Sequence, residues 1–292
     1  MRSDGYSSHF ITAQDGLKLH ARTYGRRTNA HLPIVCLPGL ARTSADFHVL
    51  GLALSAEQRF VMALDYRGRG RSEHDPDPRN YSVIVELADV QAVLTALGIG
   101  RAVFIGTSRG GILVMLLATA RPAAIAGAIL NDIGPVIEPQ GLVRIKGYVG
   151  KLPQPNSFEE GAGILRQLFG TQFPRLTEDD WSASAERMWE EKEGRLVPTY
   201  DVRLAKTLDT IDPGRPLPPL WKEFGALARV PVMVIRGANS DLLSSATVAA
   251  MRARRTALEV IEVPDQGHPP LFVEPGIIRR IATFTASCEM PH

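Results

Sequence analysis

The sequence predicts an α/β domain in which a mostly parallel sheet of about eight strands carries helices on both faces. One observation behind this prediction is a series of short runs rich in Val, Ile and Leu, each bounded by turn residues, as is typical of strands buried on both sides. A second is that helical patterns separate these runs, and such alternation favours a parallel sheet. The chain of 292 residues is also long enough for one large domain that carries an insertion.

The predicted elements alternate from residue 33 onward. Before them, SSHFITA and LKLHARTY flank Asp15-Gly16 and predict a hairpin, which would give the sheet an antiparallel edge. Strands are predicted at residues 33–38, 60–65, 102–106, 126–131, 230–237 and 258–263. Helices are predicted at residues 44–57, 82–97, 109–120, 245–255 and 273–287.

The alternation stops after NDIGP (131–135) and resumes near Trp221. A segment that leaves a sheet and returns the chain to it is typical of a cap over the site. We therefore predict a core domain of residues 1–133 and 221–292 and a helical cap at residues 134–220. Helical stretches are expected in the cap at 157–169, 177–191 and 200–207. Five aromatic side chains of the cap could line a pocket or form the core of the cap itself: Phe158, Phe169, Phe173, Trp181 and Trp189.

Composition and charge exclude several classes of protein. The formal net charge is only +2, and RGRGR (67–71) is too short and too rich in glycine to indicate a nucleic-acid-binding stripe. Cys36 and Cys288 form neither a disulfide framework nor a metal-binding spacing, which fits a reducing compartment. The first ten residues lack an apolar stretch, and no window is as long as a membrane span. We therefore expect a cytoplasmic protein without nucleic-acid or membrane partners, and a homodimer is left open.

The stretch FIGTSRGG (104–111) places Ser108 between two glycines, directly after a predicted strand and before a predicted helix. A sharp strand-to-helix turn would hold the serine in a strained conformation that only small neighbours such as Gly106 and Gly110 permit. The hydroxyl would then lie at the carboxyl edge of the sheet, beside the free N–H groups of a helix start. The alternative is an ordinary Gly/Ser loop, so a base and an acid must be found as well.

Both partners follow predicted strands downstream. His268, in VPDQGHPP, comes after the strand at 258–263, and Asp241, in RGANSDLLS, comes after the strand at 230–237. Ser108, Asp241 and His268 would therefore meet at the carboxyl edge of the sheet, where such folds bind ligands. Asp132, in LNDIGP, also follows a strand and is the alternative acid. We favour Asp241 because its surroundings are polar and open.

With these residues in place, the chain resembles the serine-dependent α/β-hydrolases along nearly its whole length. The segment DYRGRGRS (65–72) resembles a turn of that family in which residues like Arg67 and Ser72 bond to loop backbone. The resemblance implies a catalytic triad of Ser108, Asp241 and His268. It also implies an oxyanion hole of two backbone N–H groups, for which Leu40 and Arg109 are the candidates. The family often has a histidine at the position that Pro38 occupies in CLPGLARTSADF.

These features predict the hydrolysis of a small carboxylic ester or lactone through an acyl-enzyme on Ser108. No cofactor is expected, and no cluster of side chains has the spacing of a metal site. Arg42 or Arg109 could bind a substrate carboxylate, or both could bond structurally to loops or solvent. A serine nucleophile argues against epoxide hydrolases and haloalkane dehalogenases, which use an aspartate. Two alternatives remain, a carbon–carbon bond hydrolase of ring-cleavage products and a non-catalytic ligand-binding protein.

Overall fold

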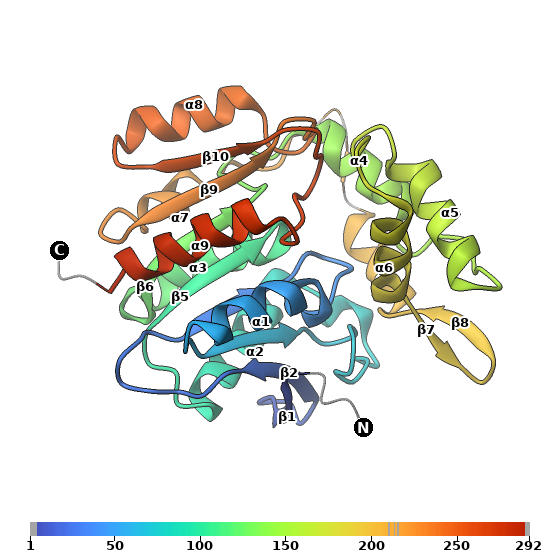
Figure 1. Ribbon diagram of the computed structural model, residues 1–292, viewed down its shortest axis with the longest axis horizontal. Coiled ribbons are helices and arrows are strands. Elements are labelled where there is room, and N and C mark those ends of the chain that lie inside the picture. Colours follow the sequence, from blue (N-terminus) through green and yellow to red (C-terminus); the bar gives the residue numbers. More distant parts are fainter. Residues whose placement is uncertain (1–4, 210, 213, 215, 290–292) are drawn as a thin grey trace.

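The computed structural model describes residues 5–209, 211–212, 214 and 216–289. Its centre is an eight-stranded sheet in the order β1-β2-β4-β3-β5-β6-β9-β10. The strand pairs from β4 to β10 are parallel, whereas β1 and β2 form an antiparallel edge (Figure 1). This arrangement confirms the predicted fold class. The strands are β1 (Ser7–Thr12), β2 (Lys18–Tyr24), β3 (Ile34–Leu37), β4 (Val61–Asp65), β5 (Ala102–Thr107), β6 (Ile125–Asn131), β9 (Val232–Gly237) and β10 (Glu259–Val263).

The central strands β3, β4, β5, β6 and β9 are buried along their whole length and mostly apolar, because both faces of the sheet are covered. Along β5, Phe104 enters one hydrophobic core while its neighbours Val103 and Ile105 enter the other. Helices α1 and α9 cover the face that is in front in Figure 1, and α2, α3, α7 and α8 pack on the opposite face. The bounds of these helices are α1 (His48–Ala56), α2 (Val83–Ala96), α3 (Arg109–Ala120), α7 (Trp221–Gly225), α8 (Ser245–Arg254) and α9 (Pro275–Ser287).

Between β6 and α7 the chain leaves the sheet and forms the inserted segment, residues 134–220, on the right in Figure 1. Its described elements are α4 (Pro139–Tyr148), α5 (Phe158–Phe169), α6 (Glu178–Met188), β7 (Trp189–Lys192), β8 (Arg195–Pro198) and the 3₁₀ helix Val202–Leu208. Helices α5 and α6 pack on each other through Leu165, Trp181 and Ala185, which are buried. This packing explains the helical pattern of the two stretches.

Two parts of the inserted segment differ from the prediction. Helix α4 was not expected, because PQGLVRIKGY contains two glycines, which weaken the helical signal. The helix expected at 177–191 ends at Met188, since Trp189–Lys192 pairs with Arg195–Pro198 as a two-stranded antiparallel sheet. Glu193 and Gly194 form the turn, and both have positive φ, as a tight hairpin requires.

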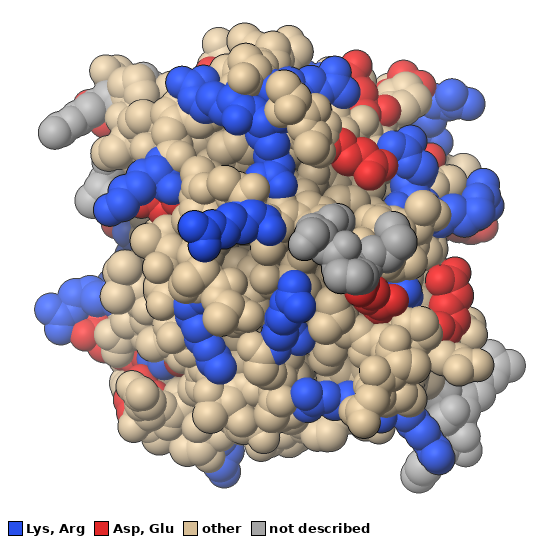
Figure 2. Space-filling view, turned by 90° about the vertical axis from the view of Figure 1, so that its left-hand side faces the viewer, with Lys and Arg blue, Asp and Glu red and all other residues tan. Residues whose placement is uncertain are grey.

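The end of the molecule away from the inserted segment carries many Lys and Arg side chains, spread among neutral residues (Figure 2). A shallow groove at the amino ends of the parallel strands is lined by Arg27, Arg101 and Arg229 among others. None of the helices in the described part of the chain is long and apolar enough to cross a membrane.

Candidate active site

Ser108 lies at a sharp turn between β5 and α3. Its backbone has φ +50° and ψ −111°, a conformation that costs a non-glycine residue about 1–3 kcal/mol and that persists only where the surroundings enforce it. The neighbouring glycines show what enforces it. A Cβ at Gly106 would lie 2.5 Å from the carbonyl carbon of Gly110, and one at Gly110 would lie 2.0 Å from the carbonyl oxygen of Leu37. The strand and the helix thus approach more closely than a side chain would allow.

His268 and Asp132 continue a hydrogen-bonded line from this serine. Nε2 of His268 lies 2.9 Å from Oγ of Ser108, and Nδ1 lies 2.7 Å from Oδ2 of Asp132. The His268 side chain is 3% exposed and that of Asp132 is fully buried. Because an ionised carboxylate only accepts hydrogen bonds, it orients the imidazole with the hydrogen on Nδ1 and leaves Nε2 free to accept the serine proton.

Asp132 has further donors besides the histidine. Its Oδ1 accepts the backbone N–H of Gly237 at 2.8 Å, and its Oδ2 accepts the hydroxyl of Ser240. Asp132 comes directly after β6, the neighbour of β5, which ends one residue before Ser108, and it also has a positive φ of 53°. These donors satisfy a buried carboxylate beside the imidazole.

The structure differs from the expectation for Asp241. Its carboxylate forms a two-pronged ion pair with Arg144 of α4, with Nε–Oδ2 and Nη2–Oδ1 distances of 2.6 and 2.8 Å. Asp241 lies four residues beyond the end of β9, and the backbone of Gly141 in α4 donates to its carbonyl. Within the described residues, Asp132 and not Asp241 is the carboxylate hydrogen-bonded to His268.

The ion pair between Asp241 and Arg144 gives a pH-dependent prediction. Burial raises the pKa of Asp241, but the bonds from Arg144 outweigh it, so the pKa lies below its ordinary value of 3.8. A lowered pKa stabilises the fold above that ordinary value, and the gain is lost as the pH falls through the folded-state pKa. We expect Asp241→Asn to lower the free energy of unfolding by about 1 kcal/mol at pH 7, and the difference to shrink below pH 3.8. Denaturant unfolding at pH 7 and pH 3 measures this, and a difference that grows in acid would contradict it.

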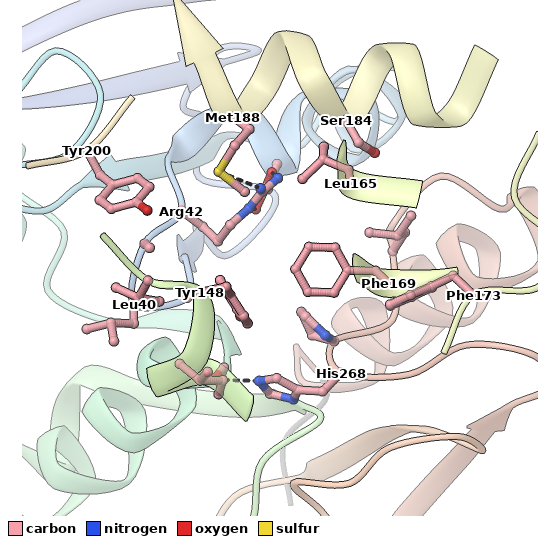
Figure 3. A pocket seen from close by; sticks show the side chains of 18 of the residues that line it. Leu40, Arg42, Tyr148, Leu165, Phe169, Phe173, Ser184, Met188, Tyr200 and His268 are labelled. Atoms are coloured by element: carbon pink, nitrogen blue, oxygen red, sulfur yellow. Dashed lines mark hydrogen bonds and ion pairs between the residues drawn. The ribbon is translucent and has the colours of Figure 1, made fainter. Parts of the chain in front are cut away.

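Ser108 and His268 open into a cavity between the core and the inserted segment (Figure 3). The core contributes the loop Gly39–Arg42 and the segment from His268 to Leu271. The inserted segment contributes mostly apolar side chains, among them Tyr148, Leu165, Phe169, Phe173, Trp181, Met188 and Tyr200. Phe169, Phe173 and Trp181 thus line the cavity, whereas Phe158 and Trp189 are not among the described lining residues and pack in the core.

The two arginines considered for substrate binding lie in different places. Arg42 lines the cavity, where its side chain points inward (Figure 3). Arg109 is not among the described lining residues: its Nε pairs with Glu86 at 2.7 Å and its Nη2 donates to the carbonyl of Tyr81. A substrate role for the Arg109 side chain therefore has no support in the geometry, because its guanidinium holds α3 to α2.

Glu86 is a residue that the sequence reasoning missed. It is fully buried, pairs with Arg109 through one oxygen and lies 2.7 Å from Arg69 Nη2 through the other. Burial raises the pKa of Glu86, but the guanidinium groups of Arg69 and Arg109 lower it by more. The pKa therefore lies below its ordinary value of 4.5, and the carboxyl stays ionised. Arg69 in turn donates to the carbonyl of Leu40 at 2.8 Å. One carboxylate therefore ties the loop at Leu40 to the start of α3.

The turn at 65–72 agrees only in part with the expected backbone contacts. Ser72 donates to the carbonyl of Asp65 at 2.6 Å, as expected. Arg67 instead pairs with three carboxylates, those of Asp15, Asp75 and Asp89.

A second Ser–His–Asp line lies at the antiparallel edge of the sheet. Ser8 Oγ is 3.0 Å from Nε2 of His20, whose Nδ1 is 2.7 Å from Asp65 Oδ2. Ser8 stands in the extended strand β1 and is exposed, so it has neither the strained turn nor the adjoining helix start of Ser108. The two lines thus share their hydrogen bonds and differ in the backbone that carries the serine.

The mostly parallel sheet, covered on both faces, and the serine at the turn between β5 and α3 are features of one class of hydrolase fold. The model of the alpha/beta hydrolase family matches residues 34–278, and the chain belongs to this family.

Named relatives cover most of the chain. The sequence is 36% identical over 254 residues to the 3-hydroxybutyrate-oligomer hydrolase of Cupriavidus necator, and the aligned region covers 84% of this chain and 85% of the relative. It is 27% identical over 286 residues to the 2-(acetamidomethylene)succinate hydrolase of Mesorhizobium japonicum, and this alignment covers 97% of this chain and 98% of the relative. The structure resembles that of an alpha/beta hydrolase from Novosphingobium aromaticivorans, with a TM-score of 0.90 and 38% sequence identity. The superposition covers 97% of this chain and 98% of the other.

Proposed function

We propose that this protein is a serine hydrolase that cleaves a small carboxylic ester. The observation that carries the proposal is the hydrogen-bonded line from Ser108 through His268 to Asp132, at the wall of a mostly apolar cavity. A serine alone is a weak nucleophile, whereas one that is bonded to an oriented imidazole can attack a carbonyl carbon.

In the proposed reaction, His268 Nε2 takes the proton of Ser108 as Oγ bonds to the ester carbonyl carbon. The ester C–O bond then breaks, and the leaving alkoxide takes that proton from His268. Water attacks the acyl-enzyme in the same way, with His268 as base, and the acid leaves with Ser108 restored to its hydroxyl form. Asp132 holds the imidazole in the productive tautomer and stabilises its positive charge.

The backbone N–H groups of Leu40 and Arg109 are proposed to hold the oxyanion. Arg109 is the first residue of α3, so its N–H has no carbonyl of the same helix to bond. The loop before Leu40 lies against the nucleophile, because a Cβ at Gly39 would be 3.9 Å from the Cβ of Ser108. The partial positive charge at the start of α3 adds to the stabilisation.

The inserted segment is proposed to act as the cap that shapes this cavity. Its two ends are joined, since the N–H of Leu220 donates to the carbonyl of Pro135 at 2.7 Å. Its middle is tied to the core as well, because Tyr81 donates a hydrogen bond to Asp201. This support fits a division of the chain into a core of residues 1–133 and 221–292 and a cap of residues 134–220.

Esters of short hydroxy acids are the substrates to test first, since the relative in Cupriavidus necator is named as a hydrolase of 3-hydroxybutyrate oligomers. We expect the purified protein to hydrolyse the linear dimer of 3-hydroxybutyrate, and to prefer short over long chains among p-nitrophenyl esters from acetyl to decanoyl. Product release is measured by chromatography for the dimer and by absorbance for the others. If a lactone or a vinylogous diketone is cleaved and no open-chain ester is, the proposal is wrong and the alternative chemistry is supported.

A further inference from the structure

Arg42 and Asp46 lie in the wall of the cavity, and Arg187 lies next to Asp46 without being among the described lining residues. Arg42, in the loop after β3, pairs with Asp46 through Nε and Nη2, at 2.7 and 2.5 Å. Nε of Arg187, on α6, lies 3.5 Å from the same carboxylate, and its Nη2 donates to Ser184. The three charged side chains are between 20% and 24% exposed, so they are partly removed from water. The cluster carries one excess positive charge beside an otherwise apolar cavity.

One nitrogen of Arg42 has no strong acceptor. Among the residues that the structure describes, its Nη1 has the sulfur of Met188 as its hydrogen-bond partner, at 3.9 Å, and both side chains line the cavity (Figure 3). A thioether is a weak hydrogen-bond acceptor, whereas a guanidinium edge fits a carboxylate closely. An anion that reached this point would therefore gain a charge-assisted hydrogen bond at the expense of a weak contact.

Two tyrosines beside Arg42 add neutral donors. The hydroxyl of Tyr200 accepts the backbone N–H of Gly150 at 3.0 Å, which leaves its own hydrogen available to an acceptor in the cavity. Tyr148 lines the cavity from α4 (Figure 3). Burial raises the pKa of both phenols above the ordinary value of 10.0, so both keep their hydrogens at neutral pH. Hydroxyl donors at the wall of a cavity favour a ligand that accepts hydrogen bonds.

This cluster lies close to the nucleophile. A Cβ at Gly39 would be 3.3 Å from Cγ of Arg42 and 3.9 Å from the Cβ of Ser108, so both side chains lie beside Gly39. An ester carbonyl at Ser108 and an anionic group at Arg42 can therefore belong to one small molecule.

We propose that Arg42, supported by Arg187 and Tyr200, forms a binding site for a free carboxylate of the substrate. The inference rests on the proposed ester hydrolysis and specifies its substrate class: a short aliphatic ester that carries a carboxylate a few bonds from the scissile carbonyl. Asp46 holds Arg42 in place and shares its charge, while Arg187 supplies the second positive charge that attracts the substrate anion.

The test compares the linear dimer of 3-hydroxybutyrate with its carboxamide, in which a neutral group of nearly the same shape replaces the carboxylate. In Arg42→Met we expect kcat/KM for the dimer to fall about 10- to 100-fold, mainly through KM, because a charge-assisted hydrogen bond is lost. Activity on the carboxamide should stay within about threefold, since that substrate never uses the charge. Arg42→Lys should restore part of the loss on the dimer, because it keeps the charge but not the planar pair.

The matched control is Arg101→Met, which removes one exposed positive charge before β5, at the groove far from the cavity. It should leave the ratio of the two kcat/KM values unchanged, while melting temperatures verify that each variant folds. If Arg42→Met lowers the values for both substrates equally, the carboxylate site is wrong and ester hydrolysis stands. If the wild type cleaves neither substrate, ester hydrolysis of this class is wrong. The site is then tested by calorimetry with 3-hydroxybutyrate alone, and equal heats from wild type and Arg42→Met would overturn it.

Discussion

The Ser108→Ala variant is expected to lose at least about 10⁴-fold in kcat on any ester that the wild type hydrolyses, with its melting temperature unchanged or raised. The loss follows because the variant has no oxygen to form the acyl-enzyme, while the oxyanion donors and the cavity remain. Stability is retained because alanine fits where serine fits, and the strained backbone at φ +50° is the same in both.

Ser8→Ala is the matched control for this prediction. Ser8 has the same kind of histidine and aspartate behind it, His20 and Asp65, but it stands on an extended strand. A fluorophosphonate probe should add its mass to the peptide that contains Ser108 and leave Ser8 unmodified. If Ser8→Ala abolished turnover and Ser108→Ala did not, the site would have been assigned to the wrong end of the sheet.

Asp132→Asn is expected to lower kcat by roughly 10⁴-fold with little change in KM. The amide would donate a hydrogen to Nδ1 and so favour the tautomer whose Nε2 already carries one, which then cannot take the serine proton. It would also fail to stabilise the imidazolium that forms in the reaction. The measurement is steady-state hydrolysis of p-nitrophenyl acetate by the purified variant beside the wild type.

Asp241→Asn separates this prediction from the one that the sequence favoured. Its carboxylate serves Arg144 in the structure, so we expect kcat to stay within about fivefold of the wild type, well short of the loss that removal of a triad acid causes. Activities in the reverse order would restore Asp241 as the acid. The two variants remove the same charge from neighbouring loops, so their difference reports position alone.

The sheet could be predicted because the physical cause of each strand is local. An apolar run such as 102–106 must be buried on both sides, and turn residues mark its ends, so β5 differs by one residue from the prediction. Ser108 could be predicted for a related reason, since Gly106 and Gly110 are required by a close approach of strand and helix that is itself local.

The acid could not be chosen from the sequence because the choice depends on a contact between distant segments. Both Asp132 and Asp241 follow strands that end at the same edge of the sheet. What decides is where the Asp241 side chain turns, and it turns to Arg144 on α4, a helix that the sequence did not predict. Because α4 was not predicted, the contact of Asp241 with Arg144 could not be predicted either.

The contacts of the Arg109 side chain could not be predicted either, because they too join distant segments of the chain. A charged residue next to a nucleophile suggests substrate binding, but its partner Glu86 lies on α2, 23 positions away in the sequence. Glu86 carries no sequence signal of its own, because a glutamate in a helix is most often a solvated residue. Only the packing of α2 on α3 shows that it is buried.

The ion pairs that join Arg69, Glu86 and Arg109 limit which substitutions this protein can accept at these three positions. Arg69 fixes the Leu40 loop and Arg109 begins the helix behind Ser108, so the two amides proposed to hold the oxyanion are aligned by one shared carboxylate. A substitution of Glu86 alone would leave two cations facing each other, the fully buried Arg69 and the partly buried Arg109, and disturb both amides at once. The three residues should therefore be inherited, and engineered, as a single unit. Libraries that vary one of them at a time would lose nearly every member, whereas libraries that exchange all three together could reach new positions of the two amides.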